Sequence, residues 1–222
     1  INIENRWSRN RTNDLQHAFF NGVGYVAWEN VFGFVNLITD RDAETLRRVA
    51  MVQRQFAPLF VSKDWRPYER TLQFGIFASR FPGDRRTVWT LINRSEFAVA
   101  GEQLNVPHVD GMRYYDVWNG IELSPRIEHD RAIIELAIDG RGFGAVLATA
   151  GEEPGLADFL KAMAARAATP LSSYSSAWTP APQELVGIAA TAPYGVAPAG
   201  MVAIPATDFD FKVRGEGVGG YG

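Results

Sequence analysis

Two acidic residues, Glu4 and Glu29, each directly follow a short and mostly apolar run of the sequence. These runs, residues 1–3 and 23–28, are typical of β-strands buried in a sheet. In α/β sheets, chemistry is placed just beyond the carboxyl ends of the strands. Adjacent strands lie about 4.8 Å apart, so neighbouring parallel strands would bring both carboxyl groups to one rim. Glu4 and Glu29 are therefore the candidate catalytic residues.

A pair of carboxyl groups at such a rim suits the hydrolysis of a glycosidic bond. The two groups lie about 5 Å apart in enzymes that retain the anomeric configuration and about 6.5–9.5 Å apart in those that invert it. One group acts as an acid with a raised pKa while the other stays ionised. Two alternatives stay open for Glu29, which can instead pair with a nearby arginine to hold the rim or bind a substrate hydroxyl.

Further candidates for substrate binding surround these carboxylates. Trp28 offers a flat apolar face and an indole N–H donor, which suit the floor of a sugar subsite, although a purely structural role is the alternative. Asn30 can hydrogen-bond sugar hydroxyls. After the first strand, Arg6, Arg9 and Arg11 can bind carboxylates or sulfates on a substrate, or they can support the loops.

Residues 1–66 follow the order strand, helix, strand, helix, which predicts a parallel sheet. We expect Thr12 to cap a short first helix that ends at Asn21-Gly22, and Thr39 or Asp40 to cap a longer second helix. Three arginines are expected on the solvated face of the second helix, namely Arg47, Arg48 and Arg54. Two strand–helix units cannot close a barrel, so we interpret this segment as the C-terminal units of a (β/α)8 barrel, with six further units upstream.

Residues 67–150 change to the period of β-strands and predict an antiparallel β-sandwich. Six runs are expected as strands: Phe74–Phe81, Thr87–Asn93, Gln103–Val106, Met112–Trp118, Ala132–Ile138 and Gly142–Ala148. The dipeptide Asn119-Gly120 predicts a two-residue hairpin turn. The aromatic residues of this segment are expected in its core: Trp89, Tyr114, Tyr115, Trp118 and Phe143.

Residues 151–199 predict one helix, from about Leu156 to Ala168, followed by a linker rich in Pro and Ala. Residues 200–222 open with a new strand pattern, Met201–Phe211, in which exposed Asp208 and Asp210 alternate with phenylalanines. The predicted fold class is therefore α/β plus all-β: two terminal barrel units, a sandwich, a helix, a linker and the start of another domain.

Composition excludes several classes of function. The 222 residues include no Cys and three well-separated His, so we expect neither thiol chemistry nor a histidine-built metal site. The net charge of −3 gives no basic surface for nucleic acid, and no apolar run is long enough to cross a membrane. No cofactor is expected. We expect the sequence, which starts with Ile1, to be a piece of a longer chain, so localisation and oligomeric state stay open.

Several stretches resemble glycoside hydrolases in which a TIM barrel precedes a β-sandwich. The likeness lies in architecture rather than in a single motif, and it rests on residues 21–33, Asn93-Arg94, residues 113–120 and residues 142–148. It implies a carbohydrate substrate and a parent hydrolase of the bacterial type, and we expect this piece alone to be inactive. The alternative is a degenerate barrel whose sandwich serves as a carbohydrate-binding or protein-interaction module.

A second resemblance is shorter. Gly200–Phe209 resembles the opening strand of the formylglycine-generating (sulfatase-modifying factor) family, although Ala206-Thr207 departs from its usual small or Gly pair. The resemblance implies a fusion protein. The catalytic cysteines of that family would lie downstream, so it assigns no site residue to this sequence. A third interpretation is therefore that the activity belongs to the downstream domain and that this region is its scaffold.

Overall fold

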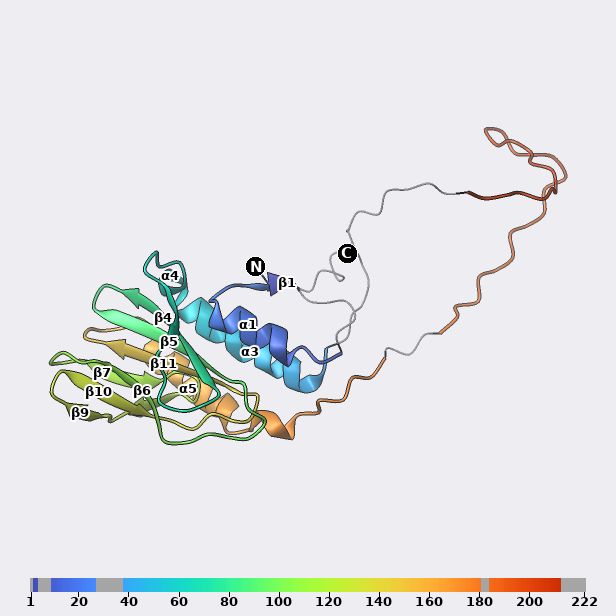
Figure 1. The fold of residues 1–222 in the computed structure, drawn as a ribbon. Helices are drawn as coiled ribbons and strands as arrows, with labels where there is room; N and C mark the ends of the chain where they lie inside the picture. The colour runs from blue at the N-terminus through green and yellow to red at the C-terminus, as the bar shows by residue number, and fades with distance from the viewer. Residues whose placement is uncertain (1, 4–8, 27–37, 181–183, 213–222) are drawn as a thin grey trace. The chain divides into compact units, whose positions relative to one another are not determined.

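A computed structural model describes residues 2–3, 9–26, 38–180 and 184–212 of the chain (Figure 1). The chain divides into two compact units, residues 1–181 and residues 182–222, which are described separately. The first unit contains all the helices and strands found in the described residues.

The amino-terminal part of the first unit contains two short parallel strands and two helices. Strand β1 (Asn2–Ile3) pairs with β2 (Tyr25–Val26), with Ile3 opposite Val26. Helix α1 (Thr12–Phe20) lies between them in the chain, and α3 (Asp40–Gln55) follows β2. The predicted parallel pairing and both predicted helices are thus confirmed. Helix α1 ends at Phe20 and is followed, as expected, by Asn21 and Gly22, whose φ of 62° suits glycine.

The starts of the two helices differ in how they are capped. In α3 the Thr39 hydroxyl accepts a hydrogen bond from the backbone N–H of Asp42 (3.1 Å), which confirms the predicted cap. In α1 the prediction was wrong, because Thr12 lies inside the helix. The side chain of Asn10 accepts from the backbone N–H of Thr12 (3.0 Å), and the Thr12 hydroxyl donates to Asp42 instead.

Residues 66–149 form two antiparallel sheets, as the sandwich prediction requires. The larger sheet contains, in spatial order, β3 (Arg66–Glu69), β4 (Ile76–Gly83), β5 (Arg86–Asn93), β11 (Phe143–Thr149), β7 (Arg113–Asp116) and β8 (Ile121–Leu123). The smaller sheet contains β6 (Glu102–Pro107), β10 (Arg131–Glu135) and β9 (Arg126–Glu128). The sequence did not predict β3 and β9, and it indicated β8 only through the expected hairpin turn at Asn119-Gly120. All three are short strands at sheet edges, and they are mostly exposed, so they lack the apolar alternation of inner strands.

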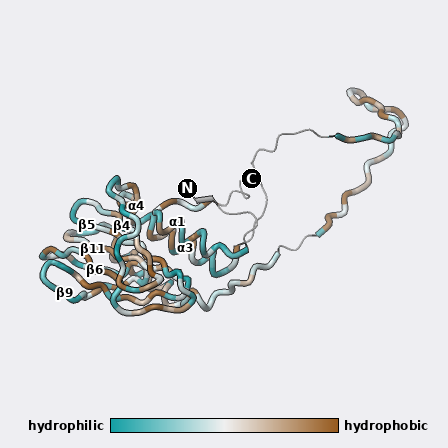
Figure 2. The backbone as a smooth tube through the Cα atoms, viewed as in Figure 1, coloured by the Kyte–Doolittle hydropathy of each residue, from teal (hydrophilic) through white to brown (hydrophobic). Residues whose placement is uncertain are grey.

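The six-stranded sheet is buried on both faces. One face packs on the smaller sheet, and residues of this layer include Trp89, Tyr114 and Val146. The other face is covered by α1, α3 and α5 (Leu156–Ala167), which bring side chains such as Phe19 and Phe159 against the sheet. The predicted core aromatics are all at most 4% exposed, which confirms that prediction. In Figure 2, hydrophobic and hydrophilic residues alternate along these elements.

The hairpin between β7 and β8 is longer than predicted. Its strands are joined by four residues, 117–120, because Asp116 pairs directly with Ile121. The Asp116 carboxylate accepts from the backbone N–H groups of Trp118 (3.1 Å) and Asn119 (3.0 Å), which holds this wider loop. The strand therefore ends at Asp116, and the side chains of Val117 and Trp118 belong to the core under the helices.

Burial raises the pKa of Asp116, and its hydrogen bonds with Asn119 and Trp118 oppose the rise.

Helix α3 is joined to α5 by a buried group of charges. Arg48 was expected on a solvated face, but its side chain is 3% exposed, and Nε donates to Glu44 (3.0 Å). Its Nη2 donates to the backbone oxygens of Arg166 and Thr169, both at 2.8 Å, so it satisfies carbonyls at the end of α5. Arg166 also donates to Glu44, at 3.1 Å. Arg47 and Arg54 are exposed, as expected.

Residues 184–212 of the second unit form no helix or strand, so the predicted strand Met201–Phe211 is wrong for this structure. Asp208 and Asp210 are exposed, as are the phenylalanines between and after them. A strand needs a partner for its N–H and C=O groups, and the described part of this unit offers none.

The contact between α1 and the six-stranded sheet depends on the buried side-chain amide of Gln16. Gln16 is fully buried, and its Nε2 donates to the carbonyls of Asn93 (2.9 Å) and Gly142 (3.0 Å) at the ends of β5 and β11. Its Oε1 accepts from Arg94 (2.7 Å). A single side chain thus fixes where α1 crosses the sheet.

We predict that Gln16→Leu lowers the free energy of unfolding by about 1–3 kcal/mol, because it leaves two buried carbonyls and Arg94 without this partner. Urea denaturation measures the change. Asn13→Ala is the matched control, since Asn13 is exposed and accepts from the same arginine (2.9 Å). The control should change stability by less than about 0.5 kcal/mol. Equal effects of the two variants would contradict the role given to Gln16.

The charged group at Glu44 should make stability depend on pH. Burial raises the pKa of Glu44, but hydrogen bonds from Arg48 and Arg47 and the charge of Arg166 outweigh it, so the pKa lies below its ordinary 4.5. Ionised Glu44 therefore stabilises the fold above pH 4.5, and this stabilisation is lost as the pH falls through the lowered pKa.

We predict that Glu44→Gln destabilises the protein most at neutral pH, by about 1–3 kcal/mol, and progressively less below pH 4.5. Urea denaturation across this pH range measures the difference between variant and wild type. Glu152→Gln, at an exposed position, is the charge-matched control and should have little effect at any pH. A difference that stays constant with pH would show that the charge of Glu44 is not what stabilises the fold.

Candidate active site at the ends of β1 and β2

The chain leaves β1 and β2 at the same end of the parallel pair, because parallel strands point the same way. It continues to α1 and α3, whose first turns are held together by Asp42. One carboxylate oxygen accepts from the backbone N–H of Arg11 (2.8 Å), and the other accepts from the Thr12 hydroxyl (2.9 Å). Asp42 is 2% exposed. We call the rim the carboxyl ends of β1 and β2 together with the starts of α1 and α3 that Asp42 joins.

Five of the seven residues predicted for this site lie outside the described residues: Glu4, Arg6, Trp28, Glu29 and Asn30. Their roles stay predictions. The structure places the strand ends before them and the helix starts after them at the rim.

The two remaining predicted residues differ in their surroundings. Arg9 is exposed, and its guanidinium carbon lies 4.9 Å from the ring centre of Trp178. Arg11 is fully buried, which favours the alternative role of supporting the loops over direct contact with a substrate. Of these two predicted residues, Arg9 is therefore exposed beside an aromatic ring, and Arg11 is part of the buried structure.

Sequence reasoning missed two residues that belong to the rim. Asp42 was visible only as an acid in the first turn of a helix, where the helix dipole already accounts for it. Trp178 lies in a stretch of Ser, Ala and Pro, and nothing in the local pattern connects it with β1. Both are recognised only from contacts between segments that are distant in sequence.

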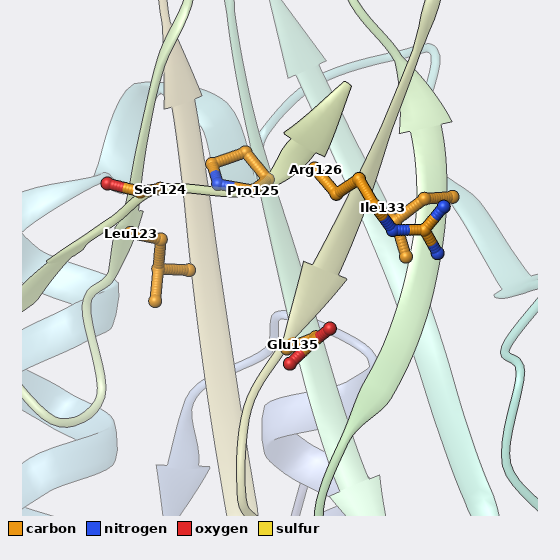
Figure 3. Close-up of a pocket in the computed structure, with 6 residues that line it drawn as sticks. All are labelled: Leu123, Ser124, Pro125, Arg126, Ile133 and Glu135. Atoms are coloured by element: carbon orange, nitrogen blue, oxygen red, sulfur yellow. The ribbon is translucent and has the colours of Figure 1, made fainter. Parts of the chain in front are cut away.

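The sandwich carries concave surfaces of its own. A cavity of about 240 Å³ lies against β8, β9 and β10, where Leu123, Arg126 and Glu135 line it (Figure 3). A wider concavity of about 870 Å³ is lined partly by Arg113 and Glu122, which form a two-point ion pair at 2.9 and 2.8 Å. In the first cavity Arg126 also forms an ion pair with Glu102, at 2.5 Å.

The described residues hold no group of three or more His, Asp or Glu side chains arranged for a metal ion. Among the helices of the same residues, none is both long and apolar enough to span a membrane.

No family model and no curated protein matches this sequence. Among the solved structures that are similar to the chain are three glycoside hydrolases. They are an α-amylase from Anoxybacillus (11% identity, 64% of this chain and 34% of that chain covered, TM-score 0.41), a GH30 endoxylanase from Clostridium papyrosolvens C71 (14%, 67% and 41%, TM-score 0.37) and the GH30 xylanase Xyn30A from Clostridium acetobutylicum (11%, 67% and 42%, TM-score 0.39).

The chain thus spans 34–42% of the length of these proteins. At such TM-scores the likeness is partial, and it says nothing about the reaction or the substrate of this chain. The candidate site therefore depends on the geometry of β1, β2 and Asp42 alone.

We predict that Asp42→Ala lowers the free energy of unfolding by about 1–3 kcal/mol, because it removes both acceptors and leaves the backbone N–H of Arg11 and the Thr12 hydroxyl without this partner. The backbone N–H of Arg11 should also exchange faster with solvent. Urea denaturation and hydrogen exchange measure the two effects. Asp40→Ala is the matched control, since Asp40 is exposed in the same helical turn. Unchanged exchange at Arg11 in Asp42→Ala would show that Asp42 does not hold the starts of α1 and α3 together.

Proposed function

We propose that this chain is part of a glycoside hydrolase and that its rim contributes to hydrolysis of an O-glycosidic bond. The observation that carries the proposal is the pair β1 and β2. Within the described residues these parallel strands pair only with each other, which leaves both outer edges for further strands. Parallel sheets are stable only as larger, covered assemblies, and further β/α units on these edges would complete a barrel.

In this proposal Glu4 and Glu29 are the two carboxyl groups of the reaction, one as general acid and the other as nucleophile or base. Trp28 and Asn30 bind the sugar, and Arg6 and Arg9 bind anionic substituents on it. The contacts of Asp42 support the proposal because they hold together the starts of α1 and α3, which follow these residues in the chain. A shift of about 1 Å between catalytic groups can cost about a hundredfold in rate.

The proposal extends to the organisation of the chain. Residues 1–66 are the barrel units, residues 67–150 the sandwich, residues 151–199 a helix and linker, and residues 200–222 the start of a sulfatase-modifying-factor-like domain. The substrate is a carbohydrate, and the sugar and the linkage are left open. Xylan and starch are starting points for assays, because two of the similar structures are named as xylanases and one as an α-amylase.

A second candidate function is a carbohydrate-binding role of the sandwich, with a non-catalytic barrel. A cavity of about 150 Å³ between α1 and the sheet favours it. Tyr68 and Phe77 line this cavity, and they are 74% and 40% exposed. Arg94 and His17 add polar groups beside the rings, and exposed aromatic rings with polar neighbours suit sugars.

The catalytic proposal predicts that residues 1–222 alone release no reducing sugar from xylan or starch. In a protein that carries the complete set of β/α units, Glu29→Gln and Glu4→Gln should each lower kcat by at least about a hundredfold, with the fold retained in circular dichroism. Glu152→Gln is the control at an exposed site outside the rim. Full activity of both rim variants would show that the catalytic residues lie on other strands. Turnover by residues 1–222 alone would contradict the need for further β/α units.

A further inference from the structure

The chain that follows α5 is directed toward the rim by a series of contacts. Arg48 binds the carbonyl of Thr169 just beyond the helix, at 2.8 Å. Leu171, in a short 3-10 helix (Leu171–Ser173), is 2% exposed and belongs to the core that covers the sheet. The carbonyl of Ser175 then accepts from the backbone N–H of Arg41 (3.0 Å), in the first turn of α3. The segment is thus anchored at three successive points.

These contacts bring Trp178 to Arg9, shortly before the start of α1. The ring of Trp178 lies against the guanidinium of Arg9, 4.9 Å from ring centre to Cζ, which is within the range of a cation–π interaction. Arg9 lies two residues before Arg11, whose backbone is held by Asp42. Trp178 itself is partly exposed. In Figure 1 the segment after α5 passes the starts of α1 and α3, in agreement with these contacts.

We propose that Trp178 is a carbohydrate-stacking residue that the segment after α5 contributes to the rim; this inference rests on the proposed function. An indole ring stacks on the apolar C–H face of a pyranose, and partial exposure leaves ring surface for such a contact. Arg9 fixes the ring from the side of the β1 loop and places hydrogen-bond donors beside it, where sugar hydroxyls would lie. The rim therefore takes residues from both ends of the first unit.

Titration of residues 1–222 with cellohexaose, xylohexaose and maltohexaose tests the inference. Binding is followed by the NMR signals of the indole N–H groups, and the Trp178 signal is assigned as the one missing from Trp178→Phe. We expect that signal to shift on addition of the best-bound sugar. The Kd should rise about tenfold in Trp178→Ala and less in Trp178→Phe, which keeps an aromatic ring.

Two control variants distinguish Trp178 from exposed aromatic rings of the sandwich. Trp65→Ala removes another partly exposed indole, which stacks on Phe81 in the sandwich, and it should leave the Kd unchanged. Tyr68→Ala removes an aromatic ring from the cavity between α1 and the sheet on which the second candidate function rests. Binding that is lost in Tyr68→Ala and intact in Trp178→Ala would overturn the inference and favour the sandwich as the binding module.

The remaining outcomes are also decisive. Sugar binding by the wild type that is equally tight in Trp178→Ala, with an unshifted Trp178 signal, would refute the inference and leave the proposed function standing. If no signal shifts for any of the three sugars at about 10 mM, which is tenfold above a millimolar Kd, the result refutes sugar stacking on Trp178 and leaves standing the proposed function, which needs further β/α units. Circular dichroism confirms that each variant is folded.

Discussion

The constraint on which the first unit depends is that its six-stranded sheet is apolar on both faces. One face is covered by the smaller sheet and the other by α1, α3 and α5. Burial of apolar area is the main favourable contribution to folding, so these helices cannot leave the sheet without exposing a large core. The rim formed by β1, β2 and their helices is therefore built on the sandwich rather than linked loosely to it.

Apolar packing alone would leave the helices free to slide, and the buried polar groups remove that freedom. Gln16 binds two carbonyls at the ends of β5 and β11, Asp42 joins the starts of α1 and α3, and Glu44 with Arg48 joins α3 to α5. Each of these polar groups has a directional partner, and a misplaced helix would leave it buried without one. Together they fix one orientation of the rim.

The sequence predicted most of the elements because hydrophobic periodicity reports burial directly. The parallel pairing, the main helices and the inner strands followed from it. Apart from the unformed strand Met201–Phe211 and the missed edge strands, the errors concern hydrogen-bond partners. Thr12 was expected to cap its own helix, but it bonds to Asp42 across thirty residues. Arg48 was expected in solvent, but it binds the end of α5. Such partners are set by the fold, and local patterns do not contain them.

Trp178 could not be found in the sequence for the same reason. Its neighbourhood is rich in Ser, Ala and Pro and has no periodicity, so no local signal distinguishes it from a linker residue. Its position follows from anchors that lie on α3, namely Arg48 and Arg41. Because Arg48 is also the residue that closes α5 onto α3, the ion pair with Glu44 has a second consequence. It fixes the start of the segment that carries Trp178. The packing of α3 against α5 therefore also determines which residue of that segment reaches the rim.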